Sequence, residues 1–231
     1  KNTLSSSDYK AGDRIPTKNG KYYMVIFGMS MDRAPSVITK ATKFDKVYCV
    51  GDSRTADTKM ALGVAVPSNV EFIAKWGEGL YWFKSTGYRQ LLSSVSKQPK
   101  NSKKAVIINL GVNDLNNGSA YVTYMKKVAA NLKKYNCKMY YLSVNPVNSA
   151  MIKSVGGKAR SEAQIASFNR TIYKNLCSGK NKSFTYINSC TNLQMKGWIS
   201  NRHDMGIYDG LHYSNATYLR IFDYCMRYLN R

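Results

Sequence analysis

The sequence is poor in acidic residues and contains only two histidines. Among its 231 residues, 13 are Asp or Glu against 35 Lys or Arg, which gives a formal net charge of +22 at pH 7. An excess of one sign attracts polyanions, so nucleic acid, anionic membranes and anionic wall polymers all qualify as partners. Taken alone, however, the charge argues for solubility and non-specific association rather than for a particular function.

Long hydrophobic runs are absent as well. The longest apolar stretches, such as 105–110, have the length of a buried strand and fall well short of the roughly 20 residues that a transmembrane helix needs. We therefore expect no transmembrane segment. The chain opens at Lys1 without a charged-then-apolar leader, and we infer export with a leader or upstream region removed.

Metal-binding patterns are also missing. Neither His203 nor His212 has a cysteine at metal-ligand spacing, and none of the five cysteines forms a CxxC pair. We therefore expect no metal and no cofactor. The odd cysteine count leaves at least one thiol without an intrachain partner, and Cys177 and Cys190, which bracket a short predicted strand, form a candidate disulfide pair.

Strand-like and helical patterns alternate along the chain. Apolar runs predict strands at 44–50, 70–74, 105–110, 138–144 and 183–188, after a first strand at 21–27. Helical spacing predicts helices ending near Leu62 and over 80–95, 120–135, 162–176 and 216–229. Such alternation is typical of βαβ units, and so of a parallel sheet with helices on both faces. We expect one domain over 1–231, with 1–43 as an N-terminal extension packed on it.

Polar and glycine residues follow the predicted strands, where open α/β sheets bind ligands. These segments are 51–53, 77–79, 111–114 and 209–212. A serine hydroxyl needs a base within hydrogen-bond reach, and that base is best held by a carboxylate. Asp209 and His212 supply both from one loop, and Ser53 at a strand-to-helix turn supplies the nucleophile. The adjacent His203 and Asp204 would point apart, so we interpret them as surface residues.

A developing oxyanion needs several donors aimed at one point. The candidates are the backbone N–H groups of Ser53 and Gly77 and the side-chain amide of Asn113. Asp52 is expected to brace the turn rather than to react. The Gly-x-Ser-x-Gly elbow of α/β-hydrolases fits poorly, because Thr55 stands where its last glycine belongs.

In order and spacing, Gly51-Asp52-Ser53, the glycine block at 77–79, Gly111-Val112-Asn113-Asp114 and Asp209-Gly210-Leu211-His212 resemble the blocks of the SGNH (GDSL-type) hydrolase family. The resemblance spans 47 to about 215, although Arg54 replaces the usual leucine. It implies a flavodoxin-like αβα sandwich with a doubly wound, parallel, five-stranded sheet. It also implies an ester hydrolase in which Ser53 attacks, His212 is the base and Asp209 orients it. Ser53, Gly77 and Asn113 would then form the oxyanion hole, with Gly77 favoured over Gly79.

The substrate is predicted from what surrounds these motifs. Aromatic residues crowd them, and no long apolar lid is present to enclose an acyl chain. We therefore expect a small acyl group, such as acetyl, on a carbohydrate or cell-wall glycan, with Arg54, Trp76 and Tyr208 as candidate substrate contacts. Transfer of the acyl group to another alcohol is a possible outcome of the same site.

We expect a bacterial monomer that is extracellular or wall-associated, is held by an anionic wall polymer and has no specific nucleic-acid partner. Two alternatives remain open at this point. One is a lysophospholipase or short-chain lipid esterase, and the other is a catalytically idle polyanion-binding module.

Overall fold

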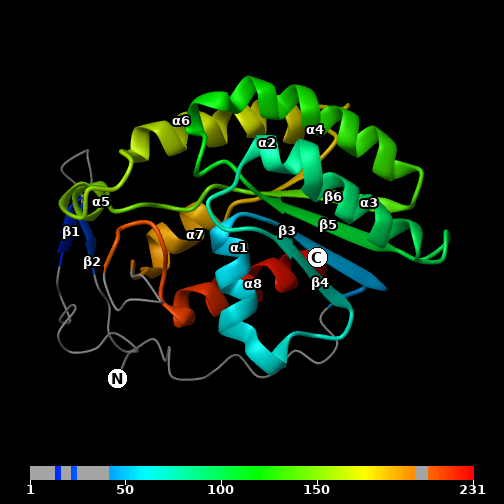
Figure 1. The fold of residues 1–231 in the computed structure, drawn as a ribbon, viewed down its shortest axis with the longest axis horizontal. Helices are drawn as coiled ribbons and strands as arrows, with labels where there is room; N and C mark the ends of the chain where they lie inside the picture. Colours follow the sequence, from blue (N-terminus) through cyan, green and yellow to red (C-terminus); the bar gives the residue numbers. More distant parts are fainter. Residues whose placement is uncertain (1–13, 17–21, 25–41, 201–207) are drawn as a thin grey trace.

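The computed structural model describes residues 14–16, 22–24, 42–200 and 208–231 (Figure 1). Its centre is a five-stranded sheet in the order β4–β3–β5–β6–β7, in which every neighbouring pair is parallel. The strands are β3 (Lys46–Gly51), β4 (Val70–Ala74), β5 (Lys104–Asn109), β6 (Cys137–Leu142) and β7 (Thr185–Ile187). This is the parallel sheet that the alternating pattern predicted, in the doubly wound order that the family resemblance implied.

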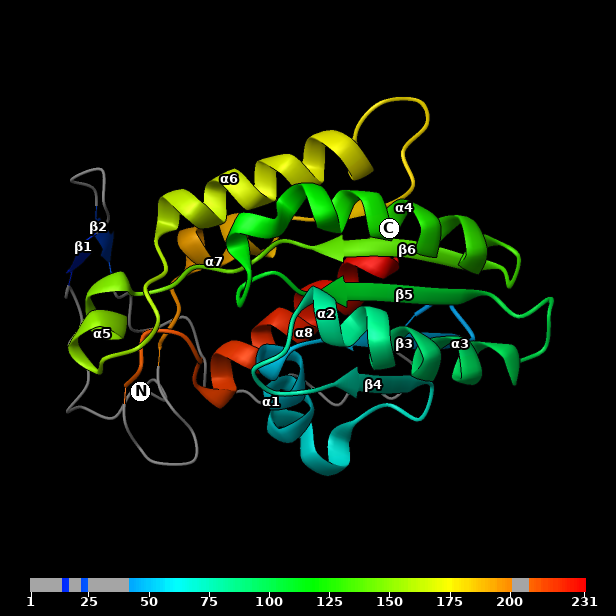
Figure 2. The same ribbon diagram turned by 45° about the horizontal axis from the view of Figure 1, so that its top comes forward.

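Helices cover both faces of the sheet, as Figures 1 and 2 show. One face carries α2 (Leu80–Trp82), α3 (Tyr88–Ser96), α4 (Gly118–Lys133) and α6 (Glu162–Ile172). The other carries α1 (Ser53–Leu62), α7 (Ser189–Lys196) and α8 (Asn215–Leu229). In Figure 2 the arrowheads of β4, β5 and β6 point toward the end of the molecule where α5 (Ser149–Ser154) lies.

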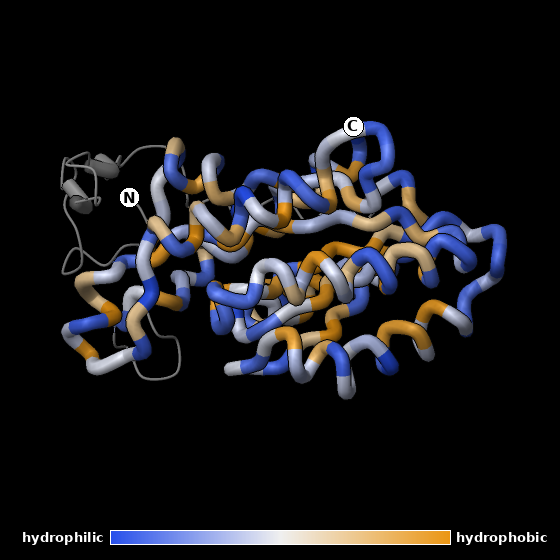
Figure 3. Tube along the Cα trace, turned by 90° about the horizontal axis from the view of Figure 1, so that it is seen from above, coloured by the Kyte–Doolittle hydropathy of each residue, from blue (hydrophilic) through white to orange (hydrophobic). Residues whose placement is uncertain are grey.

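The alternation of side chains along each strand builds two separate cores. In β3, Tyr48 and Val50 pack with α4 and α6, while Val47 and Cys49 pack with α8. Both sets are buried, as expected for an inner strand of a parallel sheet that is covered on both faces. The outer helices are amphipathic in consequence, and Figure 3 shows hydrophobic and hydrophilic stretches alternating along them.

The structure departs from the sequence prediction in several places. Helices α5 and α7 were not predicted, and the helix expected over 80–95 contains a π-helical stretch at Phe83–Gly87 that joins α2 to α3. Helix α6 likewise ends in a π-helical turn, Tyr173–Cys177. All five cysteines are free thiols, so the candidate Cys177–Cys190 disulfide is not formed.

The described residues include only short parts of the predicted N-terminal extension. Strand β2 (Tyr22–Met24) falls within the strand expected at 21–27 and pairs antiparallel with β1 (Arg14–Pro16). Most of 1–43 lies outside the described residues. Within the described ranges, no helix combines the length and apolarity needed to cross a bilayer.

Candidate active site

Ser53 sits at the turn between β3 and α1, where it is the first residue of the helix. The Asp52 side chain caps that helix by accepting a hydrogen bond from the Arg54 backbone N–H at 3.0 Å. Asp52 therefore braces the turn, as the sequence predicted. Burial raises the pKa of this carboxyl to about 6, against the opposing effect of the nearby Arg54 charge.

A continuous hydrogen-bond chain joins Ser53, His212 and Asp209. The His212 Nε2 atom lies 2.9 Å from Ser53 Oγ, and His212 Nδ1 lies 2.6 Å from Asp209 Oδ2. The other carboxylate oxygen of Asp209 accepts the backbone N–H groups of Leu211 and His212, at 2.8 and 2.9 Å. Burial of Asp209 favours its neutral form, but these hydrogen bonds outweigh that effect and lower the pKa of the carboxyl. The arrangement can hold an imidazole in one orientation beside a serine hydroxyl.

The loop that carries His212 is supported by the unpredicted helix α5. Gly210 has φ +75°, and a Cβ there would lie 2.4 Å from the Asn148 carbonyl oxygen, so only glycine fits without movement. The Asn148 N–H donates to the Gly210 carbonyl at 2.8 Å, and the Asn148 side chain caps α5. This contact fixes the Asp209–His212 turn against the segment that follows β6.

Arg54 has a different position from the one the sequence suggested. Its side chain is buried, and its guanidinium donates hydrogen bonds to the backbone carbonyls of Leu211, Asn145 and Pro146 at 2.9–3.1 Å. It also lies over the Tyr213 ring, 4.6 Å from the ring centroid. The interpretation of Arg54 as a substrate contact is therefore wrong, because these bonds make it a clamp between the His212 loop and the end of β6.

Asn113 lies in a second network, which links the loop after β5 to the glycine turn at 77–79. Its side-chain amide donates to the Glu78 carbonyl at 2.8 Å, and its side-chain oxygen accepts from Arg160 at 2.9 Å. The Arg160 Nε also donates to the Val112 carbonyl at 2.7 Å. Arg160 thus fixes which way the Asn113 carboxamide faces, a role that the sequence analysis missed.

The glycine turn is held by Asp114 as well. One carboxylate oxygen accepts the Leu80 N–H at 2.9 Å, and the other accepts the Tyr121 hydroxyl at 2.7 Å. A Cβ at Gly79 would lie 2.5 Å from this carboxylate, whereas one at Gly77, where φ is +74°, would meet no atom within 4 Å. Gly79 is therefore packed against Asp114 and Gly77 faces open space, and the choice of Gly77 as an oxyanion donor stays a prediction.

The remaining predicted residues are at the edge of this region. Trp76 is 58% exposed, and its Nε1 donates to Asp57 at 3.0 Å. Tyr208 is half-buried, whereas His203 and Asp204 lie outside the described residues. Within the described chain, no group of three or more His, Cys, Asp or Glu side chains is arranged to hold a metal ion.

Comparison with known proteins agrees with this geometry. The model of the GDSL-like Lipase/Acylhydrolase family matches residues 47–225, so the chain belongs to that family. It is an enzyme of the SGNH/GDSL hydrolase class with the α/β fold of that class. No curated protein sequence matches the chain.

Solved structures share the fold at low sequence identity. A GDSL-like lipase from Bacteroides thetaiotaomicron is 16% identical, with a TM-score of 0.56 over 80% of this chain and 86% of its own. A protein described as an SGNH hydrolase from Slackia heliotrinireducens is 12% identical, with a TM-score of 0.54 over 78% and 98%. At these identities the likeness concerns the fold and leaves the substrate to be argued from the site.

Proposed function

We propose that this hydrolase is a serine esterase that removes O-acetyl groups from a carbohydrate or cell-wall glycan. The observation that carries the proposal is the hydrogen-bond chain from Ser53 Oγ through His212 to Asp209. A serine hydroxyl becomes a nucleophile when an adjacent base removes its proton, and a carboxylate behind the base fixes the tautomer that can do so.

The reaction would proceed in two steps through an acyl-enzyme. Ser53 Oγ attacks the acetyl carbonyl while His212 Nε2 takes the hydroxyl proton, and His212 then returns that proton to the sugar oxygen as it leaves. In the second step, water gives a proton to His212 and attacks the acetyl-serine, which releases acetate and regenerates Ser53. Attack by another alcohol in place of water would transfer the acetyl group instead.

The negative charge on the tetrahedral intermediate needs fixed donors. We assign these to the backbone N–H of Ser53 at the start of α1, the N–H of Gly77 and the side-chain amide of Asn113. The Asn113 amide has two N–H groups, of which one donates to Glu78, so the other is free to bind the oxyanion. The N-terminus of α1 adds a favourable partial positive charge at the same point.

Polar side chains in the pocket beside Asn113 support a carbohydrate over a lipid. The pocket has a volume of about 230 Å³, and its lining combines the apolar Val112, Leu115 and Ala159 with polar residues that include Asn116, Lys158, Arg160, Gln164 and Asp114. Amide and cationic side chains suit a hydroxyl-rich or anionic alcohol and are a poor lining for an alkyl chain. The exposed Trp76 ring beside the glycine turn is suited to stack on a sugar face.

The test is hydrolysis of p-nitrophenyl esters from acetyl to octanoyl, followed by acetylated glycans, with the wild type, Ser53→Ala and the exposed-site control Ser85→Ala side by side. We expect a preference for acetyl, its loss in Ser53→Ala, and fluorophosphonate labelling of the wild type and Ser85→Ala alone. Rates that rise beyond butyryl would overturn the carbohydrate assignment. An absence of both turnover and labelling would point to an idle binding module.

We also place the enzyme outside the cell or at the wall of a bacterium, because a glycan of that kind is found there. Fractionation of the native host with an antibody to the chain tests this location. Recovery in the cytoplasm alone would remove wall glycan from the proposed substrates.

A further inference from the structure

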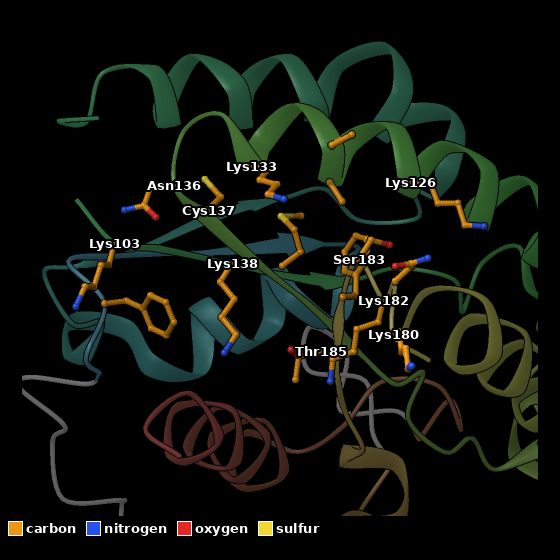
Figure 4. A pocket seen from close by; sticks show the side chains of 16 residues that line it. Lys103, Lys126, Lys133, Asn136, Cys137, Lys138, Lys180, Lys182, Ser183 and Thr185 are labelled. Atoms are coloured by element: carbon orange, nitrogen blue, oxygen red, sulfur yellow. The ribbon is translucent and has the colours of Figure 1, made fainter. Parts of the chain in front are cut away.

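A large pocket in the described part of the chain lies away from Ser53, at the amino ends of β5, β6 and β7. It has a volume of about 870 Å³. Six lysines line it, from the loop before β5, from α4, from β6 and from the segment before β7: Lys103, Lys126, Lys133, Lys138, Lys180 and Lys182. Figure 4 shows Lys103 at one end, Lys126, Lys180 and Lys182 at the other, and Lys133 and Lys138 between them. We call this pocket the lysine groove.

The lysine groove has no acidic residue in its lining. All six lysines are exposed, and within the described residues none of them has a carboxylate at ion-pair distance, in contrast to Lys46 with Glu71 and Lys75 with Glu78. The nearby Asp45 carboxylate accepts the backbone N–H of Lys103 at 2.7 Å. Six like charges around one concavity repel one another, and a bound anion would relieve that repulsion.

A seventh lysine adds to the positive potential from below the surface. Lys104 is 1% exposed, and its ammonium donates to the carbonyls of Pro99, Ser102 and Tyr135 at 2.8–3.0 Å. These partners are neutral, so the charge of Lys104 is solvated by dipoles but not cancelled. Burial raises the pKa of the Cys137 thiol, which lines the lysine groove, to about 11, and the Lys104 charge opposes that rise.

The backbone offers further donors. Strand β7 pairs with β6 only from Tyr140 onward, so within the described chain the β6 residues 137–139 have no strand partner on that side. These three residues line the groove, as do the hydroxyl residues Ser183, just before β7, and Thr185, the first residue of β7. Peptide N–H and hydroxyl groups beside ammonium groups are the donor set that binds phosphate oxygens.

The lining also indicates what kind of polyanion fits. Single-stranded nucleic acid is bound through exposed aromatic rings on which bases stack, but the two aromatic residues of the lining, Phe44 and Phe184, are buried, at 8% and 2% exposure. The lining contains no arginine. Lysine ammonium groups act as point charges on flexible stems and follow a flexible anionic chain without requiring planar groups.

We propose that the lysine groove binds a linear, base-free polymer of phosphate groups, either phosphodiester-linked or polyphosphate. The groove lies at the opposite end of the sheet from Ser53, and a six-residue strand such as β3 spans roughly 20 Å. Binding there leaves the Ser53 end open, so the polymer holds the enzyme in place during hydrolysis. This inference does not depend on the proposed esterase function.

The experiment measures binding of labelled inorganic polyphosphate. Binding of poly(glycerol phosphate) is measured in parallel, to separate a polyphosphate from a phosphodiester-linked polymer as the ligand. The groove variant combines Lys126→Gln, Lys133→Gln, Lys138→Gln and Lys182→Gln. The control variant has the same charge and combines Lys59→Gln, Lys84→Gln, Lys153→Gln and Lys196→Gln, all at exposed positions outside the groove. Circular dichroism and p-nitrophenyl acetate hydrolysis check that both variants are folded.

We expect the groove variant to bind at least tenfold more weakly at low salt and the control variant to lose less than threefold. The slope of log K against log salt should fall by about 3 in the groove variant, since each lost phosphate contact removes roughly 0.7. Equal losses in both variants would overturn the proposal, because binding would then follow net charge alone. Tighter binding of oligo-dT or of phosphatidylglycerol vesicles than of either phosphate polymer, lost in the groove variant, would also overturn it.

Discussion

The charged side chains at the two ends of the sheet differ in whether they have bonding partners. At the carboxyl end, Asp209 is hydrogen-bonded to His212, and the buried Arg54 guanidinium is hydrogen-bonded to three backbone carbonyls. At the amino end, the described residues place six lysines around one groove without a carboxylate in its lining. Paired groups are held rigidly before substrate arrives, whereas unpaired groups gain most from a ligand that supplies the missing charge. The contrast separates the end suited to chemistry from the end suited to binding.

The largest expected effect is that of Asp209→Asn, which changes the hydrogen-bond chain at the carboxyl end of the sheet. The amide can still accept the Leu211 and His212 N–H groups, but its NH₂ would face His212 Nδ1 and favour the tautomer that cannot take the serine proton. We expect kcat for p-nitrophenyl acetate to fall by roughly 10⁴-fold with the fold intact. Asp223→Asn, in a surface pair with Arg227, is the matched control and should leave kcat unchanged. A loss below tenfold in Asp209→Asn would remove Asp209 from its proposed role.

Asn113→Ala tests the second network at the same end. It removes the proposed side-chain donor to the oxyanion, and we expect a loss of about 10²–10³-fold in kcat with little change in KM. Asn131→Ala, near the C-terminal end of α4, controls for the loss of an amide, because the Asn131 side chain donates to the Tyr88 hydroxyl outside the proposed site. If KM rises while kcat stays constant, Asn113 binds the ground state and is not an oxyanion donor.

Asp52→Asn tests how the stability of the folded protein depends on pH at the carboxyl end of the sheet. The folded-state pKa of Asp52 is about 6, above its ordinary value of 3.8, so the folded protein binds this proton more tightly than the unfolded chain does. The stability contribution of Asp52 therefore falls as pH rises from about 4 to about 6. The variant keeps a cap acceptor but cannot ionise, so relative to the wild type it should gain about 1–3 kcal/mol of unfolding free energy between pH 4 and pH 7. Urea unfolding at both pH values measures this, and parallel pH profiles would contradict the assignment.

Arg160→Met tests whether Arg160 positions the Asn113 carboxamide. Arg160 touches Asn113 and Val112 through hydrogen bonds, so its loss should let the Asn113 carboxamide rotate and lower kcat by about tenfold. In the double variant with Asn113→Ala the two losses should not add, because both act through one amide. Additive losses would show that Arg160 acts on substrate directly, through the pocket it lines.

The sequence was sufficient to predict the sheet and the Ser53, His212 and Asp209 chain. Both follow from local patterns, since apolar runs mark the strands and parallel strands bring the segments after them to one edge. Helix α7 was missed because its pattern is weak, with only Ser189, Cys190 and Leu193 buried. Helix α5 was missed because it is only six residues long, although Asn148 is a recognisable N-cap.

Contacts between segments that are distant in the sequence could not be predicted from local patterns. Nothing in the neighbourhood of Arg54 indicates that its side chain turns inward to carbonyls more than 90 residues away, at Asn145, Pro146 and Leu211. Arg160 had a local signal, because it precedes the capping box formed by Ser161 and Gln164, but that signal marks a helix start and not a contact with Asn113. The lysine groove likewise collects residues from four segments, and only the fold brings them together.

The smallest effect concerns the repulsion at the amino end. Lys182→Gln removes one of the charges around the lysine groove, and we expect it to raise the unfolding free energy by a few tenths of a kcal/mol at low salt. The gain should disappear in about 1 M salt, where the Debye length falls to about 3 Å. Lys75→Gln is the matched control, because Lys75 is paired with Glu78 at 2.7 Å and its removal should leave stability unchanged or slightly lower. A loss of stability in Lys182→Gln at low salt would mean that this lysine is paired in solution, and the amino end would then resemble the carboxyl end in how it holds charge.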